Sequence, residues 1–288
     1  MTQAAVGFNE GQSLAGKRIL MSGGSRGIGL AIAKRAAEDG AQISLLAKTD
    51  KPDSRLPGTI HTAAEEIADA GGTAHPFVGD VRDYERVEEV VAQSAEKMGG
   101  IDIVVNNASA INLSGFGSLS HKRWSLMKDV NMGGTFNLIS AALPVLMESA
   151  SPRVLSLAPP INLNPQWIAS HAPYTLSKYG MTLLTLGLAE EHRNHEDFSA
   201  FCLWPRTLIA TAAIANVVGG EEGMRRSRRP EIMADAANSL FTRPAQATTG
   251  KTFIDDDVLS EDGFEDLTRY TTVPGTPDSE LQQDMFLD

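Results

Sequence analysis

The chain has 288 residues, of which 42% are hydrophobic, and it carries a formal net charge of −11. This length and apolar content suit one large α/β domain, and the acidity argues against nonspecific binding to nucleic acid or to anionic membranes. The single cysteine, Cys202, excludes an intrachain disulfide framework and a cysteine-based zinc site, and it points to a reducing compartment, here expected to be the cytoplasm. We expect no metal site and no membrane span, since no run approaches roughly 18 apolar residues.

The N-terminal part combines a leader, a strand and a glycine-rich turn. Residues 1–13 are polar and small, and we interpret them as a flexible leader. Residues 18–21 form a short apolar strand, and residues 30–40 are typical of a helix closed by a glycine. Between them lies a stretch that can bring backbone close to a pyrophosphate at the N-terminus of the helix. The expected cofactor-binding residues of this stretch are Ser22, Gly23, Ser25, Arg26, Gly27, Ile28 and Gly29. The alternative is an ordinary glycine-rich turn between a strand and a helix.

The end of the second strand, residues 41–47, bears on the choice between NAD and NADP. An acidic residue about 20 positions beyond the glycine turn holds the adenosine ribose in NAD-binding domains, and Asp50 lies near that distance. Lys48 and Arg26 can instead pair with a 2′-phosphate. The two cations favour NADP(H), and the alternative is that both are solvated surface side chains.

Two further strands end in candidate cofactor contacts. The strand at 73–78 is followed by Asp80 and Val81, where a carboxylate can accept a hydrogen bond from adenine or cap a helix. The apolar strand at 101–105 is followed by Asn107 and Ala108. Because ligands bind beyond the carboxyl ends of parallel strands, we expect these residues to line the cofactor cleft.

The second half of the chain continues the alternation of strands and helices. Strands are expected at 153–158, 199–204 and 251–255, with helices at 59–70, 84–98, 121–149 (in two pieces around Asn131), 174–192 and 232–241. The sequence therefore predicts an α/β fold: a single-domain Rossmann-type, doubly wound parallel sheet of about seven strands with helices on both faces.

The expected domain spans residues 14–255 and includes a substrate lid at 205–241, whose first part, 205–230, looks irregular. Residues 256–288 are acidic and contain two prolines, and we interpret them as an extended surface tail.

Tyr174 and Lys178 form the second informative pattern. Four residues apart on a helix, they share one face. A tyrosine has a reference pKa of about 10, and a neighbouring ammonium favours the phenolate, so the pair can perform acid–base chemistry near neutral pH. Taken alone, this spacing is common on helices. It indicates a catalytic pair only in combination with the glycine turn, which belongs to the same predicted domain.

Taken together, these motifs resemble the short-chain dehydrogenase/reductase family over roughly residues 14 to 255. The turn has the spacing Gly-x₃-Gly-x-Gly, which is similar to that of this family. The resemblance implies hydride transfer between a nicotinamide and a carbonyl or alcohol, with Tyr174 as general acid/base. It implies that Lys178 binds the nicotinamide ribose and lowers the pKa of Tyr174, and that Asn131 bends a helix and holds a relay water. It also implies that the backbone of residues 207–211 wraps the nicotinamide carboxamide, and that Pro205 and Ile209 contact the cofactor.

The chain departs from the family pattern where a serine normally follows the fifth strand. That position falls on Ala158 or Pro159, neither of which has a hydrogen-bond donor in its side chain. Asn162 or Asn164 can supply the missing donor, or both can simply form turns. Loss of one oxyanion donor costs about a hundredfold or more in other enzymes.

Two basic features of the lid leave alternatives open. Arg206 replaces the glycine of the family's Pro-Gly pair and either places a charge near the substrate or faces water. The run of arginines within 225–229 is either a solvated loop or a site for an anionic substrate handle, such as a coenzyme A phosphate.

The expected function is NADP(H)-dependent interconversion of a carbonyl and a hydroxyl on a hydrophobic small molecule. The alternatives are a cofactor-binding sensor or scaffold with weak or no turnover, and a non-redox enzyme on the same scaffold. Apolar side chains in excess of one buried face at 136–147 and 181–188 suggest a homo-oligomer, a dimer or a tetramer.

Overall fold

The computed structural model describes residues 13–52 and 58–288. The predicted leader, apart from Ser13, and most of the loop at 51–57 lie outside the described residues. Within them, all the strands join one parallel sheet in the order β3-β2-β1-β4-β5-β6-β7. The strands are β1 (Arg18–Ser22), β2 (Gln42–Ala47), β3 (Thr73–Val78), β4 (Ile103–Asn106), β5 (Arg153–Ser156), β6 (Ser199–Trp204) and β7 (Thr252–Ile254). The predicted doubly wound parallel sheet is confirmed.

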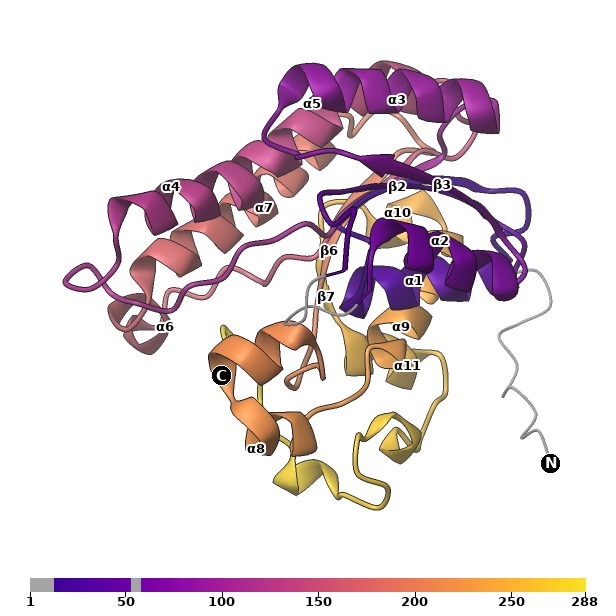
Figure 1. The fold of residues 1–288 in the computed structure, drawn as a ribbon. Helices are drawn as coiled ribbons and strands as arrows, with labels where there is room; N and C mark the ends of the chain where they lie inside the picture. The colour runs from indigo at the N-terminus through magenta and orange to yellow at the C-terminus, as the bar shows by residue number, and fades with distance from the viewer. Residues whose placement is uncertain (1–12, 53–57) are drawn as a thin grey trace.

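Helices cover both faces of the sheet (Figure 1). The helices are α1 (Gly27–Glu38), α2 (Ile60–Asp69), α3 (Tyr84–Met98), α4 (His121–Lys128), α5 (Gly134–Leu146), α6 (Pro165–Ala169), α7 (Ala172–Glu191), α8 (Gly220–Arg225), α9 (Glu231–Thr242), α10 (Ala245–Thr248) and α11 (Asp255–Glu261). On one face α1 contacts α2 and α9, and α9 contacts α11; on the other, α3, α5 and α7 pack side by side. None of the helices in the described residues has the length and apolar character to cross a membrane.

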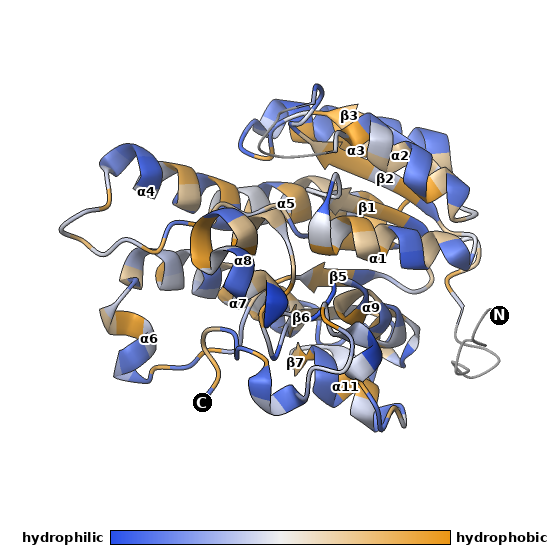
Figure 2. Cartoon of the chain, turned by 60° about the horizontal axis from the view of Figure 1, so that its bottom comes forward, coloured by the Kyte–Doolittle hydropathy of each residue, from blue (hydrophilic) through white to orange (hydrophobic). Residues whose placement is uncertain are grey.

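Successive side chains along the strands point to opposite faces of the sheet and pack into two hydrophobic clusters, one on each face. In β1, Ile19 and Met21 join the cluster under α1 and α9, while Leu20 joins the cluster under α3 and α5. Leu20 also pairs in register with Val104 of β4. Figure 2 shows β1 and β2 largely in the hydrophobic colour, between helices that carry both colours. A strand buried on both faces reads as a continuous apolar run, as these do.

Local signals account for where several helices begin and end. Thr59 caps α2 by accepting from the backbone N–H of Thr62, whose hydroxyl accepts from the N–H of Thr59 in return. Asp83 caps α3, and Gly99 ends it in the left-handed conformation at φ 75°. Between α4 and α5 the chain forms a π-helical segment, Asp129–Gly133, around Asn131. The predicted break in this long helix therefore lies where it was expected.

The structure differs from the expectations for the lid and the tail. The segment expected to be irregular holds a π-helical turn, Ile214–Val218, and helix α8. Residues 256–288 are folded onto the domain: they include most of α11 and two 3₁₀ turns, Thr268–Tyr270 and Asp278–Glu280. Tyr270 and Phe286 are 2% and 1% exposed. Burial of these apolar side chains, interspersed among the acidic ones, offsets the cost of ordering the segment.

Candidate active site

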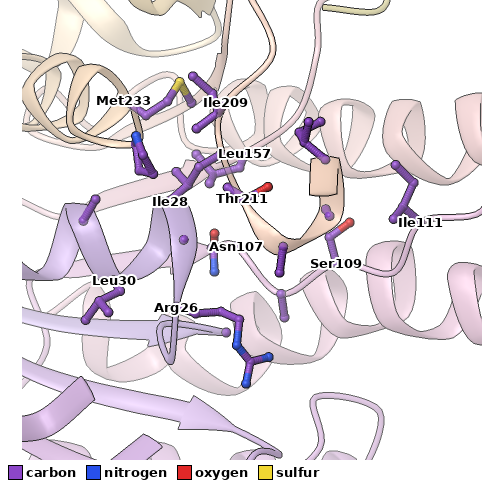
Figure 3. Close-up of a pocket in the computed structure, with 18 of the residues that line it drawn as sticks. Arg26, Ile28, Leu30, Asn107, Ser109, Ile111, Leu157, Ile209, Thr211 and Met233 are labelled. Atoms are coloured by element: carbon purple, nitrogen blue, oxygen red, sulfur yellow. The ribbon is translucent and has the colours of Figure 1, made fainter. Parts of the chain in front are cut away.

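A cavity of about 1430 Å³ opens beyond the carboxyl ends of β1 and β4, where the strand order reverses. Its walls come from the glycine turn, the loop after β4, α7, the lid and the segment at 284–285. Figure 3 shows Arg26 and Ile28 from the turn, Asn107 and Ser109 from the loop, and Thr211 from the lid around one space. This is the position at which doubly wound sheets bind nucleotides.

The glycine turn packs directly against the loop after β4. A Cβ on Gly23, which has φ +78°, would lie 2.8 Å from the Cα of Ala108, and a Cβ on Gly29 would lie 2.5 Å from the Nδ2 of Asn107. The hydroxyl of Ser22 accepts hydrogen bonds from the backbone N–H groups of Asn107 and Ala108, both at 3.2 Å. The turn therefore requires glycine at these positions.

The part of the cavity beyond the ends of β2 and β3 carries charges of both signs. Arg26 and Lys48 both line it, whereas Asp50 is not among the lining residues and bonds His61 at 2.8 Å. Lys48 lies 3.4 Å from the carboxylate of Asp80, which Arg82 also binds. Burial alone would raise the pKa of Asp80, but hydrogen bonds from Arg82 and the charge of Lys48 lower it to about 2. Asp80 is thus an ionised carboxylate that lines the cavity.

Tyr174 and Lys178 line the same cavity from α7. They are 4% and 3% exposed. The Nζ of Lys178 donates to the carbonyl of Leu157 at 2.6 Å and lies 5.0 Å from the ring centroid of Trp204. Burial lowers the pKa of Lys178 to about 8, against opposing contributions from Cys202 and Asp284. Burial, followed by the charge of Asp284, raises the pKa of Tyr174 well above its usual value.

This direction of the Tyr174 pKa differs from the lowering expected from Lys178. The reason is that burial of the ring and the acidic group of Asp284 both disfavour a phenolate. As placed here, the phenol of Tyr174 holds its proton at neutral pH.

Asn131 braces the site from behind and does not line the cavity. Its side chain accepts from the backbone N–H of Ala110 at 2.7 Å and donates to the carbonyl of Ala110 and the hydroxyl of Ser177. Asn131 is fully buried. Its amide therefore joins the loop after β4 to α7, next to Tyr174.

The candidate donors near β5 are engaged elsewhere. Ala158 and Ser156 are both fully buried, and the hydroxyl of Ser156 bonds Asn106 and Thr185. The side chain of Asn162 donates to the carbonyl of Phe286, and that of Asn164 donates to Asp288. The two asparagines thus hold the folded end of the described chain, and neither lines the cavity.

The other predicted site residues divide between the cavity wall and its support. Gly23, Ser25, Gly27, Ile28, Val81, Asn107, Ala108, Pro205 and Ile209 line the cavity. Ser22 and Gly29 support the turn without lining the cavity.

Sequence reasoning missed Asp284 and Met285, which line the cavity with Tyr174 and Lys178. They reach it because residues 282–285 run antiparallel to the chain that follows β6. The N–H of Leu208 donates to Gln282, and the N–H of Asp284 donates to Arg206. The only sequence signal was the apolar run 285–287 after an acidic stretch.

The basic features of the lid are structural. The guanidinium of Arg206 binds Asp256 and Asp257, so it neither faces the substrate space nor stays unpaired in water. Arg228 is 2% exposed and binds Asp256 and Asp278. The arginine run thus fastens the lid to residues 256–288, which neither of its two sequence interpretations had anticipated.

Comparisons with known proteins agree with this geometry. Residues 17–212 match the family model described as short chain dehydrogenase. The chain is 48% identical over 275 residues to hydroxysteroid dehydrogenase-like protein 2 of Danio rerio, covering 96% of this chain and 65% of that protein. It thus spans about two thirds of that relative's length.

Solved structures show the same fold. A short chain dehydrogenase of Mycobacterium thermoresistibile is 49% identical with a TM-score of 0.89, covering 96% of each chain. A short chain dehydrogenase of Mycobacterium paratuberculosis bound to NAD is 20% identical with a TM-score of 0.70, covering 84% of this chain and 97% of its own.

Proposed function

The chain belongs to the short-chain dehydrogenase family, whose members are oxidoreductases with nicotinamide cofactors, and we propose that it interconverts a carbonyl and a hydroxyl on a hydrophobic small molecule by NADP(H)-dependent hydride transfer. One observation carries the proposal: Tyr174 and Lys178 share the wall of a single cavity with the glycine turn. Proton transfer and dinucleotide binding thereby meet at one place.

The residues at the cavity fit a dinucleotide. The close approach of the backbone at Gly23 and Gly27 and the N-terminus of α1 suit a pyrophosphate. Asp80 and Val81 would hold the adenine, Lys178 the nicotinamide ribose, and the backbone of residues 207–211, with Pro205 beside it, the nicotinamide.

The preference for NADP(H) rests on charge. Arg26 and Lys48 line the adenosine end, and Asp50, the residue that would favour a ribose 2′-hydroxyl, does not. A 2′-phosphate carries negative charge and acceptor oxygens that two cations can bind. NADPH, when bound, supplies the hydride that reduces the carbonyl carbon.

The chain's own part in reduction is to deliver a proton. The phenol of Tyr174 donates to the carbonyl oxygen as the carbon accepts hydride, and its raised pKa keeps it protonated and ready to act as the acid. Lys178 is held by Leu157 and keeps the positive charge near the phenolate that forms. Asn131, through Ala110 and Ser177, fixes α7 relative to the loop after β4. Ile111, Leu157, Trp204 and Met285 offer an apolar surface to the substrate.

A second candidate function is a cofactor-binding sensor or scaffold with weak turnover. It is favoured by the side chains after β5: Ala158 and Pro159 cannot donate, and Ser156 is committed to Asn106 and Thr185. In this alternative, binding of NADPH changes the lid but no substrate is reduced at a useful rate.

Substitution Tyr174→Phe separates the two functions. We expect the wild-type chain to oxidise NADPH with at least one probe from a panel of phenanthrenequinone, an aliphatic methyl ketone and acetoacetyl-coenzyme A, and with NADH less efficiently. Tyr174→Phe should bind NADPH as tightly, by quenching of tryptophan fluorescence, while kcat falls at least a hundredfold. Undiminished kcat in the variant would refute the role of Tyr174. Tight NADPH binding without turnover of any probe would favour the sensor.

The proposal extends to assembly and location. Phe136 on α5 and Leu176 and Leu183 on α7 are 56%, 54% and 61% exposed, an unusual exposure for large apolar side chains on neighbouring helices. We expect these faces to meet in a homo-oligomer in the cytoplasm. Sedimentation of a strict monomer would contradict the assembly.

A further inference from the structure

The site lacks a second donor for the substrate oxygen on the β5 side. No side-chain donor exists at Ala158 or Pro159, and Asn162 and Asn164 are bound to residues 286 and 288. Reduction of a carbonyl by Tyr174 alone leaves one lone pair of the developing alkoxide without a partner. A donor from elsewhere in the cavity wall would complete the site.

Residues 281–288 bring Asp284 and Met285 to the wall of the cavity and are held on two sides. On one side, the backbone N–H of Leu208 donates to Gln282, and that of Asp284 donates to Arg206. The indole of Trp204 also donates to the carbonyl of Met285 at 3.0 Å. On the other side, the ring of Phe286 packs among aromatic rings of α6, α7 and β6. The ring centroids within 6.4 Å of Phe286 belong to Trp167, His171, Tyr174, Tyr179 and Trp204.

The segment carries the carboxyl group of Asp284 to the cavity wall that also contains Tyr174 and Lys178. One carboxyl oxygen, Oδ1, accepts the backbone N–H of Met285 at 2.6 Å. The other, Oδ2, has no hydrogen-bond partner among residues 13–52 and 58–288. Asp284 lies close enough to influence both Tyr174 and Lys178 electrostatically.

We propose that Asp284, in its protonated form, donates a hydrogen bond from Oδ2 to the same substrate oxygen that Tyr174 protonates, and so replaces the serine that this chain lacks. This inference rests on the proposed reductase function. The carbonyl carbon gains the hydride, its oxygen takes the proton of Tyr174, and the proton of Asp284 stays on Asp284 throughout. Asp284 therefore orients the carbonyl and stabilises the developing charge without being consumed.

The surroundings of Asp284 favour a neutral carboxyl. Burial is the main cause that raises the pKa of Asp284, and the nearby carboxyl of Asp255 at the start of α11 adds to it. The backbone N–H of Met285 and the charge of Lys178 oppose them, and the pKa is raised to about 7. Asp255 is itself fully buried, with Oδ2 unpartnered in the described part of the chain, and its pKa is also raised to about 7. The phenol of Tyr174, whose pKa is also raised, is uncharged and does not oppose this. The guanidinium of Arg206 is taken by Asp256 and Asp257. Two buried acids this close disfavour double ionisation, so a proton remains available.

The test compares pH profiles of kcat and KM for phenanthrenequinone reduction in the wild-type chain and three variants. Asp284→Ala should lower kcat about a hundredfold, the cost of one oxyanion donor, with NADPH binding unchanged. Asp284→Asn keeps a donor that cannot ionise, so it should stay within about tenfold of wild type. The wild-type rate should fall as pH rises through about 7, where Asp284 ionises, and this limb should be missing from Asp284→Asn. Gln283→Ala, an exposed neighbour, is the matched control and should behave as wild type.

Three results would overturn the inference. An Asp284→Ala variant within threefold of wild type, with the same limb near pH 7, shows that Asp284 makes no such bond. An Asp284→Asn variant as slow as Asp284→Ala, with activity that rises with pH in the wild type, shows that a carboxylate is needed. A wild-type chain that reduces none of the three panel probes removes the reductase function and this inference with it. The first two outcomes leave the reductase standing.

Discussion

The ring of Phe286 should hold residues 281–288 against the active site, and its removal should release them. Phe286 is 1% exposed, and replacing a buried phenylalanine by alanine typically costs about 3–5 kcal/mol. The lower figure alone corresponds to roughly a hundredfold increase in the equilibrium constant for opening the segment. The other contacts of the segment are hydrogen bonds, each worth about 1 kcal/mol net, and the buried side chains of Leu281 and Leu287. They hold the segment equally in the wild type and the variant, so they do not make up the loss.

The backbone of Phe286 provides an internal check. Its φ of 73° is the single positive value at a residue other than glycine among the described residues. That conformation costs roughly 1–2 kcal/mol for a residue with a Cβ, and glycine escapes this cost. Phe286→Gly should therefore open the segment several-fold less than Phe286→Ala, which reverses the usual order of glycine and alanine. Both variants lose the ring, so the difference isolates the backbone.

Amide hydrogen exchange measures the opening directly. The reporters are the N–H groups of Leu208, Gln282 and Asp284, which bond Gln282, Arg226 and Arg206 across the contact. We expect them to exchange about a hundredfold faster in Phe286→Ala, and kcat to fall with them because Asp284 leaves the cavity. Phe116→Ala is the control, since Phe116 is 86% exposed. Exchange within threefold of wild type in Phe286→Ala would show that the ring does not hold the segment.

Substitutions at the glycine turn, at Lys48 and at Asp102 should change cofactor binding or stability in different ways. Gly23→Ala, which places a Cβ 2.8 Å from Ala108 at φ +78°, should weaken NADPH binding at least tenfold in a fluorescence titration. Gly187→Ala is the control, because exposed Gly187 has nothing within 4 Å of its Cβ position, and it should stabilise α7 by about 1 kcal/mol. Lys48→Ala should raise the Kd for NADPH about tenfold and leave that for NADH within twofold; equal losses for both would contradict the 2′-phosphate role. Burial would raise the pKa of Asp102, but hydrogen bonds from Arg18 and Ser149 hold this pKa below its usual value. The ionised carboxylate therefore stabilises the fold fully above about pH 4, and this stabilisation is lost as the pH falls further. Asp102→Asn should cost about 3 kcal/mol at neutral pH and make Tm depend less on pH in acid, and an unchanged dependence would contradict this.

The sequence predicted those parts of the site whose conformation depends on residues close together in the chain. The glycine turn, the i, i+4 pair on α7 and the break at Asn131 each depend on neighbours a few residues apart. Local spacing therefore predicts both the turn and the face that Tyr174 and Lys178 share, and the alternation of strands and helices predicts the sheet.

The position of residues 281–288, which bring Asp284 and Met285 to the cavity wall, could not be predicted in the same way. The contact between Asn162 and Phe286 joins residues 124 positions apart, and no periodicity marks either partner. The acidic composition of 256–288 suggested a solvated tail because its carboxylates are visible in the sequence, whereas their partners are not. Arg228 with Asp256 and Arg206 with Asp257 became apparent only once the lid was folded.

Transfer of deuterium from NADPH to a substrate carbon distinguishes a reductase from a protein that only binds the cofactor. The wild-type chain would be mixed, in a single turnover, with the aliphatic methyl ketone of the probe panel and NADPH that carries two deuterium atoms at the reactive carbon of its nicotinamide ring, and the product examined by mass spectrometry. We predict one deuterium on the carbon that becomes the alcohol, and no labelled product from Tyr174→Phe under the same conditions. Saturating NADPH binding with no deuterium in any product of the probe panel would contradict the proposed reductase.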